Sequence, residues 1–210
     1  MLKRNTTCSP SMSVVFQESM KLLCGHAPPA GARPELDAAA PYRLARITDV
    51  PAITRIHNES IADRVATFET ELRTEAEVAA ALAERGERYP TVVAEHGGQV
   101  IACAGAGTYR PRACYAGVAE FSVYVARASR GRGAGQVVLA GLIEECARRG
   151  FWTLVSRIFP ENMASRALCR RLGFREVGIY RRHGQLDGAW RDCVIVERIL
   201  RGADDDHPGR

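Results

Sequence analysis

The stretch VAEFSVYVARASRGRGAGQVVLAGLIEECARR, residues 118–149, changes from a strand pattern to a helix pattern across a glycine-rich turn. Residues 118–125 alternate with a period of two, so successive side chains are expected on opposite faces of a strand. One face carries Glu120, Ser122 and Tyr124, and the other carries Phe121, Val123 and Val125. Apolar residues at helical spacing then predict a helix over about residues 135–149. A strand joined to a helix by such a turn indicates an α/β protein.

The turn RGRGAGQ, from Arg130 to Gln136, is suited to hold a phosphate group. Glycine permits positive φ and a close approach of the backbone to a ligand. The first N–H groups of a helix lack internal partners and lie at the positive end of the helix dipole. Two rival phosphate loops are excluded, because no Gly-Lys-Ser/Thr triplet occurs and Gln136 and Val138 stand where a dinucleotide fingerprint needs its third glycine. The alternative is a turn with a purely structural role.

Strand and helix patterns interleave on both sides of this stretch. Thr48 and Asp49 offer a helix N-cap with Pro51 just inside the helix, and Thr74 to Glu77 form a capping box. Strands are expected at residues 42–47 and 151–158, hairpins at 91–107 and from 174–180 to 190–200, and helices after 49 and 74 and over 162–172. A mixed sheet flanked by helices follows from this order.

The two ends of the chain differ from the periodic part. Residues 1–40 mix a short apolar patch with Pro, Gly and Ala and lack sustained periodicity. We expect a disordered N-terminal extension there, or a start codon placed too far upstream, and no signal peptide. Residues 41–200 form the expected single domain, and residues 201–210 a flexible tail.

The composition is that of a globular protein. The 210 residues include 29 Lys and Arg against 24 Asp and Glu, a net charge of +5, which suits an anionic ligand. The basic residues are spread over many elements without a recognised nucleic-acid motif, which argues against a nucleic-acid module. No stretch approaches the roughly 20 apolar residues of a membrane span. Seven scattered cysteines without a CxxC pair argue against a zinc site or a disulfide framework and favour the cytoplasm.

The chain resembles the GCN5-related N-acetyltransferase (GNAT) family, and within it the phosphinothricin and arsinothricin N-acetyltransferases. The segments that carry the resemblance are IADRVATFETE (61–71), YRPRACYAGVAEFSVYVAR (109–127), RGRGAGQ (130–136), PENMASRALCRRLGF (160–174) and GAWRDCVIVER (188–198). The resemblance covers about residues 42–200. It implies a central mixed, mostly antiparallel twisted sheet, flanked by helices, with a V-shaped cofactor cleft.

The resemblance also implies a cofactor site for acetyl-CoA, and it implies no metal. In the family, backbone groups at the end of the central strand hold the pantetheine arm, which lies beside them as an added strand would, and the glycine-rich turn holds the pyrophosphate. On this chain the corresponding residues are Val123, Tyr124 and Val125 for pantetheine, and Arg130, Gly131, Arg132, Gly133, Ala134, Gly135 and Gln136 for pyrophosphate. Asn162 resembles a further cofactor contact, although an asparagine at this position is also an ordinary N-cap.

Acetyl transfer to an amine needs a base, because amines are mostly ammonium ions at neutral pH. By the resemblance, Glu120 is the candidate and acts directly or through water. Its neighbours on the strand are apolar or hydroxylic, and a carboxylate in a partly dry cleft becomes a better base. The alternative is a carboxylate that only faces solvent.

One position departs from the family pattern. Cys169 stands where many members carry Tyr and the phosphinothricin enzymes carry His, a residue expected to protonate the leaving thiolate or position the acceptor. A buried cysteine in a helix is more often packing, so the general acid stays unassigned. Tyr180 is a distant candidate. Arg181, Arg182 and His183 are expected in the last hairpin connection, near cofactor phosphates, at a dimer contact or in solvent.

The acceptor side is expected to bind an oxyanion. Arg110 and Arg112 flank Pro111, and Tyr115 and Phe68 match aromatic positions of the herbicide-modifying relatives. Arginine forks bind oxyanions in a bidentate manner, although two loop arginines can also be simply solvated.

The resemblance therefore implies an acetyl-CoA-dependent N-acetyltransferase of a glutamate analogue. Arsinothricin is expected first, then phosphinothricin or methionine sulfoximine, with resistance by detoxification as the outcome. The partners are a small amino-acid substrate and a second copy of the chain in a homodimer, without nucleic acid or membrane. The alternatives are an acetyltransferase for another amine or a protein N-terminus, and a regulatory domain that binds acetyl-CoA without catalysis.

Overall fold

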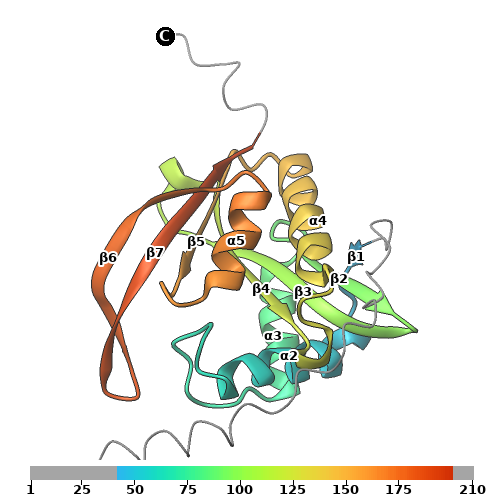
Figure 1. The fold of residues 1–210 in the computed structure, drawn as a ribbon. Helices are drawn as coiled ribbons and strands as arrows, with labels where there is room; N and C mark the ends of the chain where they lie inside the picture. Colours follow the sequence, from blue (N-terminus) through green and yellow to red (C-terminus); the bar gives the residue numbers. More distant parts are fainter. Residues whose placement is uncertain (1–41, 201–210) are drawn as a thin grey trace, which may run out of the picture. The chain divides into compact units, whose positions relative to one another are not determined.

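The computed structural model describes residues 42–200, which are coloured in Figure 1. The expected N-terminal extension and C-terminal tail lie outside the described residues.

The described residues form one sheet of seven strands in the order β1-β2-β3-β4-β5-β7-β6 (Figure 1). All neighbouring strands are antiparallel except β4 and β5, which are parallel. The strands are β1 Tyr42–Leu44, β2 Thr91–His96, β3 Gln99–Thr108, β4 Val118–Val125, β5 Thr153–Ile158, β6 Arg175–Leu186 and β7 Ala189–Ile199. The predicted mixed, mostly antiparallel sheet is confirmed.

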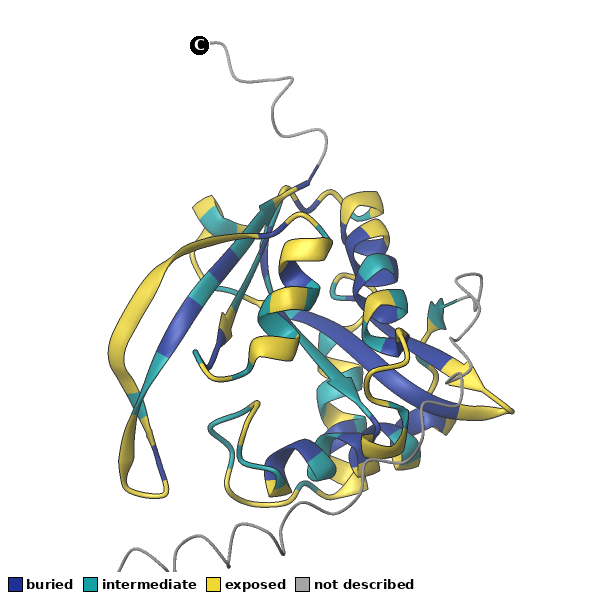
Figure 2. Ribbon diagram, viewed as in Figure 1, coloured by how far each residue is buried: buried dark blue, intermediate teal, exposed yellow. Residues whose placement is uncertain are grey.

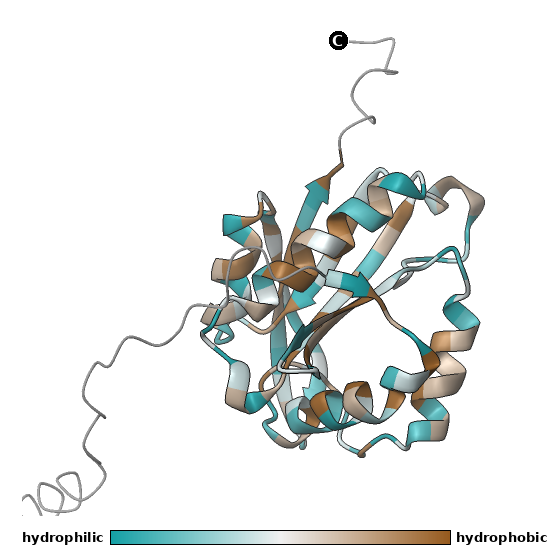
Figure 3. Ribbon diagram, turned by 90° about the vertical axis from the view of Figure 1, so that its right-hand side faces the viewer, coloured by the Kyte–Doolittle hydropathy of each residue, from teal (hydrophilic) through white to brown (hydrophobic). Residues whose placement is uncertain are grey.

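Helices cover both faces of this sheet. The helices are α2 Val50–Ala62, α3 Glu75–Arg85, α4 Ala134–Arg148 and α5 Met163–Arg171. One apolar cluster joins α4 and α5 to one face of the sheet, and a second joins α2 and α3 to the other. Buried residues accordingly follow the inner sides of the helices and the central strands (Figure 2), and hydrophobic strand segments lie between the helices (Figure 3). Burial of these two faces is the main source of stability for such a layered fold.

Two short-range predictions are confirmed by their geometry. The Thr74 hydroxyl accepts a hydrogen bond from the Glu77 amide at 3.3 Å, and the Glu77 carboxylate accepts one from the Thr74 amide at 2.8 Å, so the capping box begins α3. Gly97 and Gly98 have φ of +58° and +75° and form the tight turn between β2 and β3. That conformation is available to glycine with little strain.

The strand expected over residues 42–47 ends early. β1 stops at Leu44, because Ile47–Asp49 forms a 3₁₀ turn that leads into α2. Asp49 stands at the N-cap position of α2, as predicted, but its side chain accepts no capping hydrogen bond from the helix. Its carboxylate accepts hydrogen bonds from the Arg46 amide at 2.7 Å and from both terminal nitrogens of Arg43 at 2.7 and 2.8 Å. The carboxylate therefore ties β1 to the turn rather than to the helix.

The last hairpin also differs from the prediction. Arg181, Arg182 and His183 lie inside β6, and the turn is at Asp187 and Gly188. The register with β7 shifts between Tyr180 and Gly184, and Arg182 has a φ of +49°. An irregularity of this kind breaks the period-two pattern on which the strand prediction depended.

β4 and β5 pair over only three residues and then separate. The last pair is Glu120 with Val155, while β4 continues to Val125 and β5 to Ile158. β5 remains paired with β7 on its other side as far as Ile158. The backbone edge of β4 beyond Glu120 therefore faces an opening instead of a neighbouring strand, which is the V-shaped separation expected from the sequence.

Candidate active site

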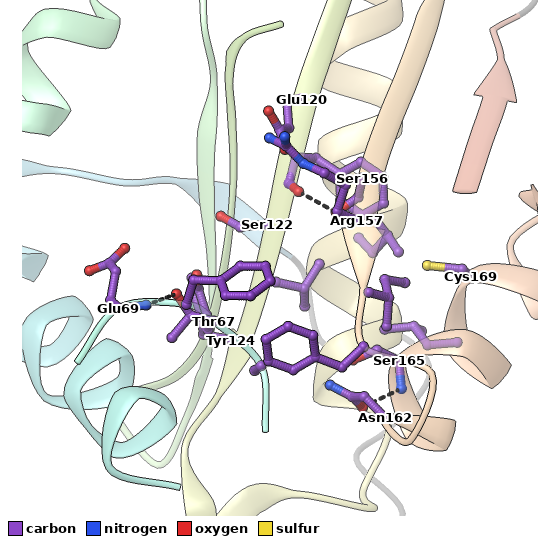
Figure 4. Close-up of a pocket in the computed structure, with 18 of the residues that line it drawn as sticks. Thr67, Glu69, Glu120, Ser122, Tyr124, Ser156, Arg157, Asn162, Ser165 and Cys169 are labelled. Carbon is purple, nitrogen blue, oxygen red and sulfur yellow. Dashed lines mark hydrogen bonds and ion pairs between the residues drawn. The ribbon is translucent and has the colours of Figure 1, made fainter. Parts of the chain in front are cut away.

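A cavity of about 590 Å³ occupies the opening between β4 and β5. Its walls are residues 120–124 of β4, residues 156–159 at the end of β5, the inner face of α5, the loop 66–69 and two residues of β6, His183 and Gly184. Figure 4 shows Glu120 and Arg157 at one end of this cavity and Asn162 and Ser165 at the other. The cavity therefore runs along the open edge of β4.

Glu120 lies at the point where the two strands separate. Its carboxylate accepts a hydrogen bond from Arg157 Nε at 2.9 Å and a second, shorter one from Arg157 Nη2. The side chain of Glu120 is 29% exposed, so solvent or a ligand reaches it. The carboxylate raises the pKa of the Arg157 guanidinium through these hydrogen bonds. The expected apolar and hydroxylic surroundings are therefore incomplete, since a cation holds the carboxylate.

Arg157 was not anticipated from the sequence. It follows Val155, the pairing partner of Glu120, by two residues and so lies on the same face of the sheet. The alternation in residues 153–158 was a usable signal, but the register between the two parallel strands was not available from the sequence.

Beyond Glu120 the edge of β4 presents backbone groups to the cavity. The Ser156 hydroxyl donates to the Phe121 carbonyl at 2.8 Å and so bridges the start of the gap between β5 and β4. Val123, Tyr124 and Val125 pair with β3 on their other side. Their placement along an open strand edge is that expected of residues that hold an extended pantetheine arm, and this role stays a prediction.

The glycine-rich turn closes the same end of β4. Gly131 and Gly133 have φ of +75° and +86°, and Gly133 is the N-cap of α4. The first amides with helical bonds are those of Gln136 and Val137, both to the Gly133 carbonyl. Within residues 42–200, no amide from Gly131 to Gly135 donates a hydrogen bond. Successive free amides at a helix N-terminus form a site for an anion.

The two arginines of the turn differ in their surroundings. Arg130 binds Asp63 at 2.6 Å and the Val125 carbonyl at 3.2 Å, so it fastens the turn to the end of α2. Arg127 binds the other oxygen of Asp63 at 2.6 Å. The two guanidinium groups lower the pKa of the Asp63 carboxyl below its usual range. Arg132 is exposed and forms no ion pair with another described residue, which leaves its charge available near the amides.

Asn162 caps α5. Its side-chain oxygen accepts from the Ser165 amide at 3.1 Å, and its side-chain nitrogen donates to the Val65 carbonyl at 3.2 Å. Asn162 also lines the cavity. The capping role is thus present, and the cofactor contact stays a prediction.

The candidate acids near the cavity are weak. Cys169 is 3% exposed and packs in the core, and burial raises the pKa of its thiol to about 12. Burial also raises the pKa of Tyr124 to about 12, and its ring stacks on His57 at 4.4 Å. Tyr180 is exposed, lies 5.0 Å from the ring of His183 and is absent from the cavity wall, whereas His183 forms part of that wall.

Only one of the residues expected on the acceptor side lines the cavity. Phe68 lines the cavity and packs edge-to-face on Phe159 at 4.8 Å. The loop between β3 and β4 carries Arg110, Arg112 and Tyr115, and none of the three lines the cavity. Arg110 and Arg112 are exposed, and the Arg110 guanidinium lies 5.8 Å from the Tyr115 ring centroid. Their role with the acceptor stays a prediction.

Among residues 42–200, no three His, Cys, Asp or Glu side chains gather as a group that could hold a metal ion. No helix in the same range is long and apolar enough to cross a bilayer.

Comparison with known proteins identifies relatives of this chain. Residues 53–174 match the model of the acetyltransferase (GNAT) family. The L-methionine sulfoximine/L-methionine sulfone acetyltransferase of Pseudomonas paraeruginosa is 34% identical over 164 residues, which cover 77% of this chain and 95% of the relative.

Solved structures give the same result. A GNAT superfamily phosphinothricin acetyltransferase from Sinorhizobium meliloti, in complex with acetyl-CoA, has a TM-score of 0.75 and 34% identity over 80% of this chain and 92% of its own. A protein from Brucella melitensis described as ribosomal-protein-alanine N-acetyltransferase has a TM-score of 0.74 and 36% identity over 76% of this chain and 99% of its own.

Proposed function

The chain belongs to the acetyltransferase (GNAT) family, and from that premise we propose that it moves the acetyl group of acetyl-CoA to the α-amino group of a small, glutamate-like amino acid. The observation that carries this proposal is the position of Glu120. Its carboxylate lies where β4 and β5 separate, at one end of a cavity that follows an open strand edge. A base at this place is close to both an extended cofactor arm and an incoming amine.

The residues of the described chain fit acetyl-CoA. The free amides from Gly131 to Gly135, the positive φ of Gly131 and Gly133 and the exposed Arg132 suit a pyrophosphate. The edge of β4 from Val123 to Val125 offers amides and carbonyls to an amide-containing arm. When bound there, acetyl-CoA supplies the acetyl group as a thioester with an electrophilic carbonyl carbon.

Glu120 acts on the amine. The acceptor arrives mostly as an ammonium ion, and the carboxylate accepts one proton from it, directly or through one water molecule. The ion pair with Arg157 keeps the carboxylate oriented towards the end of the cavity. The freed amine then forms the C–N bond as the thioester C–S bond breaks, and the thiolate departs. The nitrogen loses its second proton to solvent in this step, and Glu120 afterwards returns its own proton to solvent.

Neither Cys169 nor Tyr124 has a pKa that suits proton donation to the leaving thiolate. An ordinary thiol has a pKa of about 8.5, whereas Cys169 and Tyr124 have pKa values of about 12. Proton transfer from either residue to the thiolate is therefore uphill. A thiolate is a stable leaving group at neutral pH, and solvent protonates it.

The acceptor is proposed from two kinds of support. The relatives named above carry phosphinothricin, methionine sulfoximine and methionine sulfone in their descriptions. The resemblance carried by the segment that contains YRPR implies arsinothricin as a further acceptor. We place these compounds in one class, an amino acid with a tetrahedral oxygen-bearing group at its distal end. Acetylation removes the ammonium charge, so the product no longer resembles glutamate, and resistance by detoxification follows.

A second candidate function is supported by the Brucella melitensis structure. Its description names the N-terminal alanine of a ribosomal protein as the acceptor. An extended peptide requires more room than a free amino acid, and Phe68 and Phe159 restrict the cavity where the acceptor would lie. We therefore rank the peptide acceptor second.

Release of free thiol from acetyl-CoA tests the acceptor class. The purified full chain is assayed with phosphinothricin, methionine sulfoximine, arsinothricin, glutamate and an alanine-first peptide. The proposal expects the highest kcat/KM among the first three acceptors. A higher kcat/KM for the peptide would transfer the assignment to the second candidate.

We also propose the homodimer implied by the relatives. Val177, Ile179, Tyr180 and Trp190 form exposed apolar side chains on the outer hairpin β6–β7, which supports an interface there. Sedimentation equilibrium at micromolar concentration is expected to give twice the mass of the chain, and the monomer mass would contradict this. The cytoplasmic location stays a prediction.

A further inference from the structure

A second cavity, of about 160 Å³, lies beneath α2 and α3 on the face of the sheet opposite α4. Glu69, Ser122 and Tyr124 line both this cavity and the larger one. The smaller cavity therefore adjoins the larger one at these three residues, and we call it the side chamber. Its volume suits one small charged group rather than a whole cofactor.

Arg85, at the C-terminal end of α3, lines this chamber without an acidic partner. Its Nη1 donates to the Thr91 hydroxyl at 2.9 Å, and no carboxylate of the described residues forms an ion pair with it. Burial lowers the pKa of the Arg85 guanidinium from its ordinary value, yet arginine stays cationic in proteins. A guanidinium has five N–H donors, so most of them are available to a ligand.

The guanidinium lies on the backbone of Gly105 in β3. A Cβ added at Gly105 would lie 2.5 Å from Arg85 Nη1 and 3.2 Å from its central carbon. Any larger residue at position 105 would displace the guanidinium. Glycine is required at position 105 because the Arg85 guanidinium approaches the backbone closely, and not because of a positive φ.

The other charged groups leave the chamber positive. Arg73 is paired with Glu69, at 2.6 Å from Nε and 2.8 Å from Nη2. His57 Nε2 is buried, has no hydrogen-bond partner among the described residues and lies 3.6 Å from Glu69. Burial lowers the pKa of His57, so the ring is neutral at pH 7. Two guanidinium groups against one carboxylate attract an anion, and His57 adds one polar atom without a partner.

The sheet register sets the distance from this chamber to Glu120. Ser122 follows Glu120 on the same face of β4, about 7 Å further along the strand. Ser122 pairs with Gly105, one strand away, at about 5 Å. The diagonal between the Cα atoms of Glu120 and Gly105 is thus about 9 Å. A glutamate analogue spans roughly 5–6 Å from its amine to its distal group, by bond lengths of about 1.5 Å, and a hydrogen bond at each end completes the reach.

We propose that Arg85, seated on Gly105, binds the distal oxyanion of the acceptor while the α-amine lies at Glu120. This inference rests on the proposed function, because it names the part of the same site that selects the substrate. The guanidinium fork matches a carboxylate or a phosphinate, which binds it through two oxygens. The α-carboxylate is too close to the amine to reach the chamber. Arg85 thereby favours acceptors whose distal group carries a charge.

The test compares a charged and an uncharged acceptor in three variants. Phosphinothricin has an anionic distal group, and methionine sulfone is a similar amino acid with a neutral one. Arg85→Gln removes the positive charge. Gly105→Ala displaces the Arg85 guanidinium but leaves its charge in place. Arg55→Gln is the matched control, because Arg55 lies half-exposed on α2 and lines neither cavity.

The expected result is selective. In Arg85→Gln, KM for phosphinothricin rises about 10- to 100-fold, as for loss of a charged hydrogen-bonded pair, while kcat and the KM for methionine sulfone stay within about threefold. Gly105→Ala shifts selectivity in the same direction, and Arg55→Gln does not. Equal changes for the two acceptors, or none, would overturn the proposal.

Two other measurements separate this inference from the proposed function. Arg85→Gln is expected to unfold at the wild-type temperature or above, because it removes a partly buried charge that has no acidic partner among the described residues. A melting temperature lowered by more than about 5 °C would show a structural role and overturn the proposal. Calorimetric titration of phosphinothricin into the chain loaded with coenzyme A needs no turnover. If acetylation fails, weaker binding in Arg85→Gln than in the wild type still supports the chamber, and equal or undetectable binding in both overturns it.

Discussion

Arg157 Nε lies 2.9 Å from Glu120 Oε1, and this ion pair joins β5 to β4 at the residue where their backbone pairing ends. The carboxylate is thus fixed at the mouth of the opening between the strands. The Glu120 carboxylate is thus already oriented before a substrate binds. This lowers the entropic cost of reaching a reactive geometry.

Replacing Arg157 by Met removes this constraint. We expect kcat/KM to fall about 10- to 100-fold, because a misoriented base loses much of its catalytic effect. The unfolding free energy should change by less than about 1 kcal/mol, since the pair is partly exposed and its side chains are 46% and 29% accessible. Arg175→Met, which breaks the pair with Glu197 on the outer hairpin, is the control. Full activity in Arg157→Met would contradict a positioning role.

Gly133→Ala tests the glycine-rich turn. The N-cap glycine has a φ of +86°, so alanine adds about 1–2 kcal/mol of strain. Nothing lies within 4 Å of a Cβ at this position, and the methyl group would project into space beside the free amides. We expect the Kd for coenzyme A, measured by calorimetry, to rise about tenfold with little effect on the KM of the acceptor.

The hairpin glycine gives the matched control for that variant. Gly97 has a φ of +58° and also has open space around it, so Gly97→Ala introduces similar strain away from the turn. Gly97→Ala should lower the free energy of unfolding without weakening the binding of coenzyme A. Equal affinity for coenzyme A in wild type and Gly133→Ala would argue against a pyrophosphate at residues 131–136.

Cys169→Ala tests whether the thiol is a catalytic acid. A thiol with a pKa of about 12 is a poor proton donor to a thiolate, so kcat should stay within about threefold of wild type. Loss of the buried sulfur should lower the unfolding free energy by about 1–2 kcal/mol, measured by urea titration. Cys146→Ala, at an equally buried position of α4, should behave alike. A 100-fold loss of kcat in Cys169→Ala alone would assign the proton to this thiol.

Asp49→Asn tests the tie between β1 and the turn before α2. The hydrogen bonds from Arg43 hold the pKa of the Asp49 carboxyl below its usual range. Its stabilising effect is therefore complete above the unfolded pKa of about 3.9 and is lost as the pH falls through the lower folded value. At pH 7 we expect a loss of about 3 kcal/mol, because the carboxylate is buried and paired.

The pH dependence of that loss is the diagnostic feature. The difference between wild type and Asp49→Asn should shrink as the pH is lowered below about 4. Glu95→Gln removes the more exposed carboxylate on the same arginine and should cost less than about 1 kcal/mol. A constant difference from pH 7 to pH 2 would show that charge is not the cause.

The sequence was sufficient for the features that depend on neighbours along the chain. The capping box at Thr74, the hairpin turn at Gly97 and the passage from β4 to α4 were all predicted because each rests on local backbone chemistry. The GNAT family and its cofactor cleft followed from segments of the same kind. Glu120 could be placed at the cleft for that reason.

Features that depend on strand register or on bulges could not be predicted from the sequence. Arg157 meets Glu120 only through the pairing of β4 with β5, and Arg181 to His183 entered β6 because of an irregularity opposite β7. Arg85 lies over Gly105 across two elements that are distant in sequence. The loop with Arg110 and Arg112 lies outside the cavity wall, and the role of these two arginines with the acceptor stays a prediction.

The rate of thiol release by Glu120→Gln, at saturating acetyl-CoA and phosphinothricin, decides whether this carboxylate is the base. If it is, kcat falls at least about 100-fold, while the affinity for coenzyme A and the melting temperature stay unchanged. Turnover at the wild-type rate would show that another group takes the proton from the amine and that Glu120 is not the base.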